Sequence, residues 1–186
     1  AANRIMQKFI VEITEENEAL IQDPALECYL ITSSLDRGFA AGFARRAAAA
    51  GKLVLAGGGD APALCRDLGL DGFVLDVSAS EKIKADFDRA VKTAGKDKVS
   101  GLIVRGRRHE AMLAGECEPD FIIFQAWRDG LEKIRELVQW YSELFLIQSA
   151  VFCREEGVDF RSIAADIVIL NDRFYKILVA KKQSLD

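Results

Sequence analysis

Three consecutive glycines and an aspartate form the first group of residues suited to chemistry. Gly57, Gly58, Gly59 and Asp60 follow the apolar run 53–56 and precede a proline. Backbone N–H groups of a glycine-rich turn between a strand and a helix can close around a phosphate. The same residues are also what is left when the side chains of a former active site are absent, or simply a tight turn. The sequence leaves these interpretations open.

A second group of residues, suited to binding anions, lies at the end of the apolar run 101–105. Arg105, Arg107, Arg108 and His109 are close together in the sequence, and Arg128 follows the next apolar run. Guanidinium groups bind phosphate and carboxylate oxygens in a fork-like geometry. The competing interpretation is a solvated helix start, in which His109 has no acidic partner to orient it as a base.

Further candidates for ligand binding stand at the ends of other apolar runs. Trp127 is suited to stacking on a heteroaromatic ring, although an aromatic side chain in this place also serves packing. The remaining candidates are Asp76, Gln125, Ser149 and Asn171. For acid–base chemistry the run ends offer only Asp76 and the pair Glu15–Glu16, and we assign no catalytic residue.

The four cysteines predict ordinary thiols rather than a metal site. Cys28, Cys65, Cys117 and Cys153 are widely spaced, and His109 is the only histidine. A zinc site needs ligands at close, paired spacing. We therefore expect no metal, and mostly buried thiols in a reducing, cytoplasmic setting.

Length and composition restrict the class of protein. The 186 residues, half of them apolar, suit one domain over 1–186. A formal charge of −4 without a dense Lys/Arg block argues against nucleic acid as a partner. No apolar run approaches the roughly 18–20 residues that cross a membrane. The start, AANRIMQKF, lacks the apolar core of a signal peptide.

Short apolar runs recur along the chain, and helical segments separate most of them. Continuous apolar runs are typical of strands that are covered on both faces in a parallel sheet. The runs are 28–32, 52–56, 72–77, 101–105, 121–125, 144–148 and 166–170. Apolar residues at helical spacing mark 39–50, 81–95 and 129–144. This alternation predicts an α/β fold.

The spacing of the runs predicts a closed barrel. Every second run follows an acidic residue, namely Glu27, Asp71, Asp120 or Asp166. The runs after them start at 28, 72, 121 and 167, with separations of 44, 49 and 46 residues. Counting back by the same interval from residue 53 reaches FIVEI at 9–13. Four strand–helix–strand–helix units make a compact (β/α)8, or TIM, barrel.

Two alternatives to the complete barrel remain. Ile5, Phe9 and Ile13 also fit one face of a helix, so residues 1–22 form either a strand with a short helix or a single helix. In the helical case the first strand is irregular or missing, and the barrel is open or seven-stranded. The second alternative is an open doubly wound sheet.

Several stretches resemble the thiamine-phosphate synthase / TenI-like family. VLAGGGDAPALCRDLGLDGFVLDVS is similar to the family's strand-three to strand-four unit, with its Leu-Gly-x-Asp-Gly turn. GLIVRGRRHEAMLAGECEPDFIIFQAW resembles the strand-five to strand-six unit, with Pro-Asp before a strand. QWYSELFLIQSAVF and AADIVIL fit the last two strands in order, so the likeness spans residues 28–172.

This resemblance implies a barrel that couples a pyrimidine diphosphate to a thiazole phosphate, with magnesium on the diphosphate. Family members carry an Asn–Asp pair where this chain has Gly57 and Gly58, and a second metal-binding Asp just beyond the position of Asp76. The family's phosphate-binding glycine pair is here Ser149 and Ala150. Because both carboxylates are missing, the resemblance implies a degenerate site with no magnesium cofactor.

Three functions are therefore compatible with the sequence. The first is a transferase of the thiamine-phosphate synthase type, acting in thiamine biosynthesis. The second is a non-catalytic or repurposed barrel that binds a phosphorylated or heteroaromatic metabolite through Arg105, Arg107 and the glycine loop. The third is another phosphate-handling barrel enzyme, an isomerase or an aldolase. We also expect a homodimer, formed through an exposed part of either 129–144 or 173–182.

Overall fold

A computed structural model describes residues 7–185 of the chain. Its strands are β1 (Lys8–Glu12), β2 (Cys28–Ile31), β3 (Leu53–Ala56), β4 (Gly72–Asp76), β5 (Val99–Val104), β6 (Phe121–Ala126), β7 (Gln148–Cys153) and β8 (Ile167–Asn171). Its α-helices are α1 (Arg37–Ala49), α2 (Ala61–Leu68), α3 (Ile83–Ala94), α4 (Arg108–Glu116), α5 (Leu131–Leu144) and α6 (Asp172–Leu185). Two short 3-10 helices, η1 (Ala19–Gln22) and η2 (Phe160–Ser162), complete the described elements.

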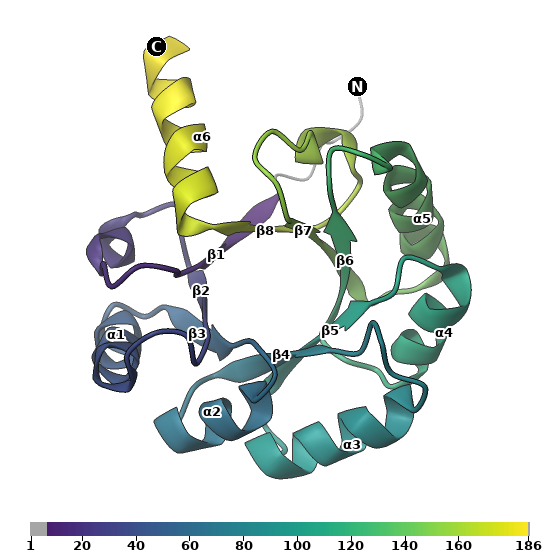
Figure 1. The fold of residues 1–186 in the computed structure, drawn as a ribbon, viewed down its shortest axis with the longest axis horizontal. Helices are drawn as coiled ribbons and strands as arrows, with labels where there is room; N and C mark the ends of the chain where they lie inside the picture. Colours follow the sequence, from purple (N-terminus) through teal and green to yellow (C-terminus); the bar gives the residue numbers. More distant parts are fainter. Residues whose placement is uncertain (1–6, 186) are drawn as a thin grey trace.

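The eight strands form a closed ring of parallel strands in sequence order (Figure 1). β1 pairs with β2 on one side and with β8 on the other, which closes the barrel. The predicted (β/α)8 barrel is confirmed, and the open doubly wound sheet is wrong. The segment FIVEI is a strand rather than a helix, whereas Ile5 lies outside the described residues.

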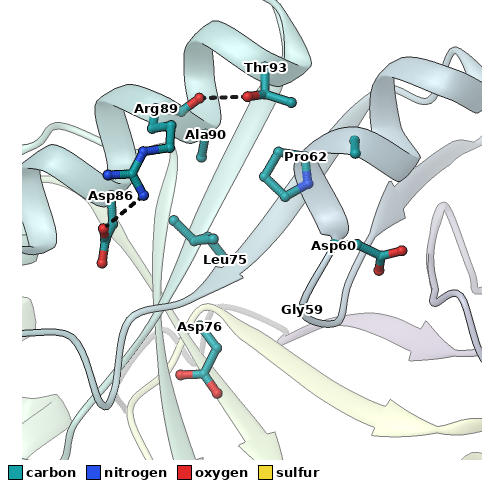
Figure 2. A pocket seen from close by; sticks show the side chains of 10 residues that line it. Gly59, Asp60, Pro62, Leu75, Asp76, Asp86, Arg89, Ala90 and Thr93 are labelled. Carbon is teal, nitrogen blue, oxygen red and sulfur yellow. Dashed lines mark hydrogen bonds and ion pairs between the residues drawn. The ribbon is translucent and has the colours of Figure 1, made fainter.

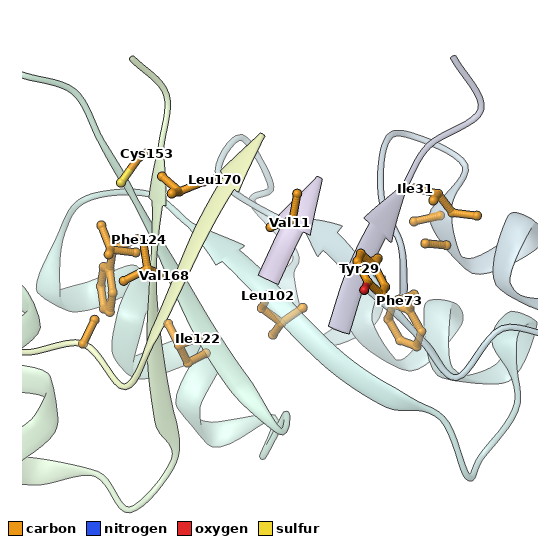
Figure 3. Packing of buried hydrophobic residues seen from close by; sticks show 14 of the residues in the cluster. Val11, Tyr29, Ile31, Phe73, Leu102, Ile122, Phe124, Cys153, Val168 and Leu170 are labelled. Carbon is orange, nitrogen blue, oxygen red and sulfur yellow. The ribbon is translucent and has the colours of Figure 1, made fainter. Parts of the chain in front are cut away.

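Side chains on the two faces of the strands enter two different clusters. Those that point outward pack beneath the helices, as Tyr29, Phe73 and Phe124 do in Figure 3. Those that point inward fill the lumen with Ile10, Leu30, Leu55, Val74, Ile103, Ile123, Phe152 and Ile169. Both faces of each strand are therefore buried, which explains the continuous apolar runs.

The amino end of the lumen is filled by Phe121. A Cβ added at Gly101 would lie 2.5 Å from the Phe121 ring, so only glycine leaves room for this ring. The lumen is thus a packed core rather than a channel, as is usual for this fold. The carboxyl end is therefore the end of the barrel at which we expect a ligand.

The helical layer is incomplete on one flank of the ring. The connections that follow β1 and β7 contain only the 3-10 helices η1 and η2 in place of α-helices. Helix α6 begins directly after β8 and runs outward from the ring (Figure 1). No helix among residues 7–185 is long and apolar enough to cross a membrane.

The position of the seventh strand differs from the prediction. Residues 144–148 were expected as this strand, but β7 is Gln148–Cys153. Helix α5 continues to Leu144, and the ring of Phe145 stacks on that of Tyr141 at 4.5 Å, which holds this segment against the helix. The residue that directly follows the carboxyl end of β7 is therefore Arg154.

The acidic residues that mark every second strand have a structural role at the amino end of the barrel. Carboxylate oxygens of Asp71, Asp120 and Asp166 accept hydrogen bonds from the backbone N–H groups of Val54, Ser100 and Ser149, at 2.8–2.9 Å. Each bond ties the residue before an even-numbered strand to the start of the preceding strand. We call these hydrogen bonds carboxylate clamps, and they account for three of the four acidic residues that recur in the sequence.

Candidate functional site at the carboxyl end of the barrel

Polar side chains at the carboxyl end replace the apolar ones of the lumen. In a strand, every second residue faces the same side. The positions two residues beyond the lumen residues Ile10, Val74, Ile103, Ile123, Phe152 and Ile169 are Glu12, Asp76, Arg105, Gln125, Arg154 and Asn171. Four of these six, Asp76, Arg105, Gln125 and Asn171, were predicted as site residues. The barrel closure therefore brings them to one mouth.

One pocket at this mouth collects three of the predicted residues. Arg105, Gln125 and Trp127 line a cavity of about 440 Å³ together with Ser78, Ala79, Val104, Gly106 and Ile134. Trp127 is 43% exposed, so a ligand can reach its side chain. The pocket combines a guanidinium, an amide and an aromatic ring, which suits an anion attached to a planar group.

The other predicted cations do not line this pocket. Arg107 lies 3.9 Å from Glu110 in an ion pair, and the guanidinium of Arg108 covers the ring of Trp140 at 4.9 Å. His109 is exposed in the first turn of α4. Arg128 forms an ion pair of 2.9 Å with Glu155. Only Arg105 of the predicted cluster faces the mouth, because the others belong to α4 or are paired.

Arg154 is a functional candidate that the sequence reasoning missed. Its Nε donates a hydrogen bond of 2.8 Å to Oε1 of Gln125, and its Cζ lies 3.7 Å from the centre of the Phe152 ring. Burial lowers the pKa of the Arg154 guanidinium, while the carboxylates of Glu12 and Asp76 act in the opposite direction. The residue was missed because β7 was expected four residues too early. The run 149–153, as apolar as 144–148, was the available signal.

Glu12 is the second candidate that was missed. It is the last residue of β1, in register with Asn171 on β8 and Leu30 on β2. Burial raises the pKa of the Glu12 carboxyl, the charge of Arg154 lowers it, and Asp172 raises it further. The prediction considered Glu15 and Glu16 instead, but both are exposed in the loop beyond the strand. Counting inward-facing positions along FIVEI would have identified Glu12.

The glycine loop contributes to a different pocket, of about 380 Å³, between α2 and α3 (Figure 2). Its acidic lining residues are Asp60, Asp76 and Asp86, and its one arginine, Arg89, pairs with Asp86 at 3.5 Å. Three carboxylates beside one paired cation do not favour an anion. The loop has a structural reason for its composition, since Gly58 has φ +88°, a conformation that favours glycine.

Two of the predicted ligand-binding residues, Ser149 and Asn171, have structural roles. Ser149 is the second residue of β7, buried at the amino end of the barrel, so its prediction as a mouth residue is wrong. Asn171 does face the mouth, and its Oδ1 accepts a hydrogen bond of 2.8 Å from the N–H of Phe174 in the first turn of α6. Next to it, the buried Asp172 accepts hydrogen bonds from the N–H groups of Thr14 and Glu15.

The residues at the mouth do not fit the magnesium that the family resemblance implies. No group of three or more His, Cys, Asp and Glu side chains among residues 7–185 is placed to hold a metal ion. Gly57 and Gly58 offer no side-chain oxygen, and Oδ1 of Asp76 accepts hydrogen bonds from the N–H and hydroxyl of Ser78. The four cysteines are unpaired, and burial raises the pKa of Cys28 and Cys153 to about 12.

A closed ring of eight parallel strands, outer helices and a polar carboxyl end define the class as a TIM barrel. Among solved structures, the chain is similar to tryptophan synthase from M. tuberculosis, with 13% identity, TM-score 0.67 and coverage of 95% of this chain and 87% of that chain. It is also similar to orotidine 5'-monophosphate decarboxylase from Methanocaldococcus jannaschii, with 15% identity, TM-score 0.61 and 92% of each chain covered.

A third similar structure is 3-keto-L-gulonate-6-phosphate decarboxylase from Vibrio cholerae, with 14% identity, TM-score 0.55 and 89% of each chain covered. At these identities the likeness establishes the fold alone. No protein-family model and no curated protein sequence matches the chain. Function must therefore be argued from the mouth itself.

Proposed function

We propose that the protein binds a small anionic metabolite with a planar, heteroaromatic part at the carboxyl end of the barrel. The observation that carries this proposal is the cavity of about 440 Å³ in which Arg105, Gln125 and Trp127 meet. Arg105 would bind the anion, Gln125 would orient polar groups, and Trp127 would stack on the ring. A volume of this size suits a single small metabolite.

Phosphate is the anion that the fold comparisons favour. Orotidine 5'-monophosphate decarboxylase and 3-keto-L-gulonate-6-phosphate decarboxylase carry a phosphorylated compound in their names. In this chain, Glu156 opposes an anion in the part of the loop after β7 that lies beyond Arg154, whereas Glu155 pairs with Arg128. Within the pocket around Trp127, the cation that can hold a phosphate is Arg105 at the end of β5.

A transferase of the thiamine-phosphate synthase type receives less support. A diphosphate needs strong neutralisation, but the glycine loop borders an acidic pocket and lacks the family's Asn–Asp pair. If a family ligand binds at all, we expect binding without magnesium.

Calorimetry with thiamine phosphate, with and without magnesium, tests the proposal. We expect magnesium-independent binding that Arg105→Ala and Trp127→Ala each weaken by about tenfold, equivalent to about 1.4 kcal/mol. Arg107→Ala is the matched control from the same loop, and it should change the affinity less than twofold, because Arg107 pairs with Glu110. Equal losses in Arg105→Ala and Arg107→Ala would refute the pocket assignment. Magnesium-dependent formation of thiamine phosphate and pyrophosphate from the pyrimidine diphosphate and the thiazole phosphate, measured in a separate assay, would instead restore the transferase.

A further inference from the structure

Arg154 is held in place without a carboxylate in ion-pair contact. Gln125 and the Phe152 ring fix its guanidinium at the mouth. Within the described chain, no carboxylate oxygen lies within 4.0 Å of its nitrogens, the limit for an ion pair. Among residues 7–185, a side-chain hydrogen-bond partner is found only for its Nε, so its terminal N–H groups are available to an anion. A half-buried guanidinium without an ion-pair partner is suited to binding an anion.

Glu12 lies across the strand β8 from Arg154. Phe152 is in register with Ile169, and Glu12 with Asn171, so Arg154, Asn171 and Glu12 follow one another around the mouth on β7, β8 and β1. Neighbouring strands are about 4.8 Å apart, which places Glu12 within reach of the field of the long Arg154 side chain. No described side chain donates a hydrogen bond to the Glu12 carboxylate or forms an ion pair with it.

We propose that Arg154 binds an oxyanion, such as the phosphate or carboxylate group of the metabolite, and that Glu12 takes up a proton when this anion binds. The inference rests on the proposed function in that the anion enters through the same mouth. It adds a second binding group, Arg154, and a proton coupling that the pocket around Trp127 does not require.

The charges around Glu12 determine the direction of the coupling. Arg154 from the end of β7 favours the carboxylate, and Asp172 from α6 disfavours it. The neighbouring strand β2 contributes only the apolar Leu30 at this level, and Asp76 from β4 acts on Arg154. An anion on Arg154 cancels the one favourable charge, so Glu12 becomes easier to protonate. By reciprocity, protonation of Glu12 strengthens anion binding.

Sulfate is a suitable probe, because it does not titrate between pH 5 and pH 8 (roughly the range of the experiment). We expect sulfate binding to weaken as the pH rises, by up to about tenfold per pH unit for one coupled proton. In Glu12→Gln the affinity should be the same at every pH and higher than in the unmodified protein at neutral pH. The carboxyl ¹³C resonance of Glu12 should titrate at higher pH when sulfate is present.

The controls separate this inference from the proposed function. Arg154→Gln should abolish the coupled sulfate site, whereas Arg105→Gln should retain it. Sulfate binding that is lost in Arg105→Gln but kept in Arg154→Gln overturns the inference and leaves the proposed pocket intact. The inference is also overturned if the protein shows no saturable sulfate binding. It is overturned as well if sulfate leaves the titration of Glu12 unchanged, and NMR of the unmodified protein tests this without any variant. If the unmodified protein does not bind thiamine phosphate but sulfate binding is still coupled to protonation of Glu12, only the proposed function is overturned.

Discussion

At the scale of single residues, the half-buried acid Glu12 makes stability depend on pH. Burial raises its pKa in the folded protein, so the folded state holds the proton more tightly than the unfolded state. Stability is therefore lost as the pH rises from the ordinary glutamate pKa through the raised one. We expect Glu12→Gln to increase the free energy of unfolding at neutral pH by about 1 kcal/mol. Urea unfolding at several pH values measures this, and a gain that persists unchanged at acidic pH contradicts it.

Gly58 and Gly59 allow a matched comparison within the glycine loop. Gly58 has φ +88°, whereas Gly59 has no positive φ and no heavy atom within 4 Å of an added Cβ. We expect Gly58→Ala to destabilise the fold by about 1 kcal/mol and Gly59→Ala to be neutral or slightly stabilising. Thermal unfolding of the two variants gives the answer. Equal effects would show that the loop conformation does not explain the glycines.

At the scale of the elements, the carboxylate clamps connect the amino ends of neighbouring strands. Removing the carboxylate in Asp120→Ala leaves the N–H of Ser100 without its partner near the buried end of the barrel. We expect a loss of about 1–2 kcal/mol in the free energy of unfolding. Glu27→Ala is the control, because Glu27 stands in the same place before β2 but is exposed and offers only its backbone carbonyl, to Leu53. A comparable loss in both variants would refute a role for the carboxylate.

The sequence was sufficient to predict the elements, but not all their boundaries. The 44–49-residue repeat predicted the barrel because it reflects a repeated backbone geometry, including the clamps. It failed at β7, where ten consecutive mostly apolar residues allow two strand positions and only the stacking of Phe145 on Tyr141 decides between them. That error placed Ser149 at the mouth and concealed Arg154. Similarly, Arg108 could not be separated from Arg105 by sequence, since its position depends on the Trp140 ring of another helix.

At the scale of the whole molecule, we expect a second copy of the chain to pack against α6. It runs outward from the ring (Figure 1), and its apolar residues Ile177, Leu178 and Val179 are only partly buried. The lining of the groove beside it includes Glu156 and Lys181, whose opposite charges would pair between two copies related by a two-fold axis. The expectation of a homodimer thus rests on 173–182 rather than on 129–144.

Sedimentation velocity distinguishes these two faces. Leu178→Glu should shift the protein to monomer, whereas Leu144→Glu, a substitution at a 62% exposed position at the end of α5, should leave the dimer unchanged. Circular dichroism must show that both variants are folded. A monomeric unmodified protein, or dissociation by Leu144→Glu alone, would contradict the assignment.

The pairing of β1 with β8 determines when the barrel can close during synthesis. These two strands are separated by nearly the whole chain, so their contact is the one with the largest loop-closure cost. Until Ile167–Asn171 leaves the ribosome, the backbone of Lys8–Glu12 has a free edge toward the missing neighbour, open to pairing with other nascent chains. β8 therefore closes the barrel, and the backbone of β1 is fully paired only after β8 has been synthesised.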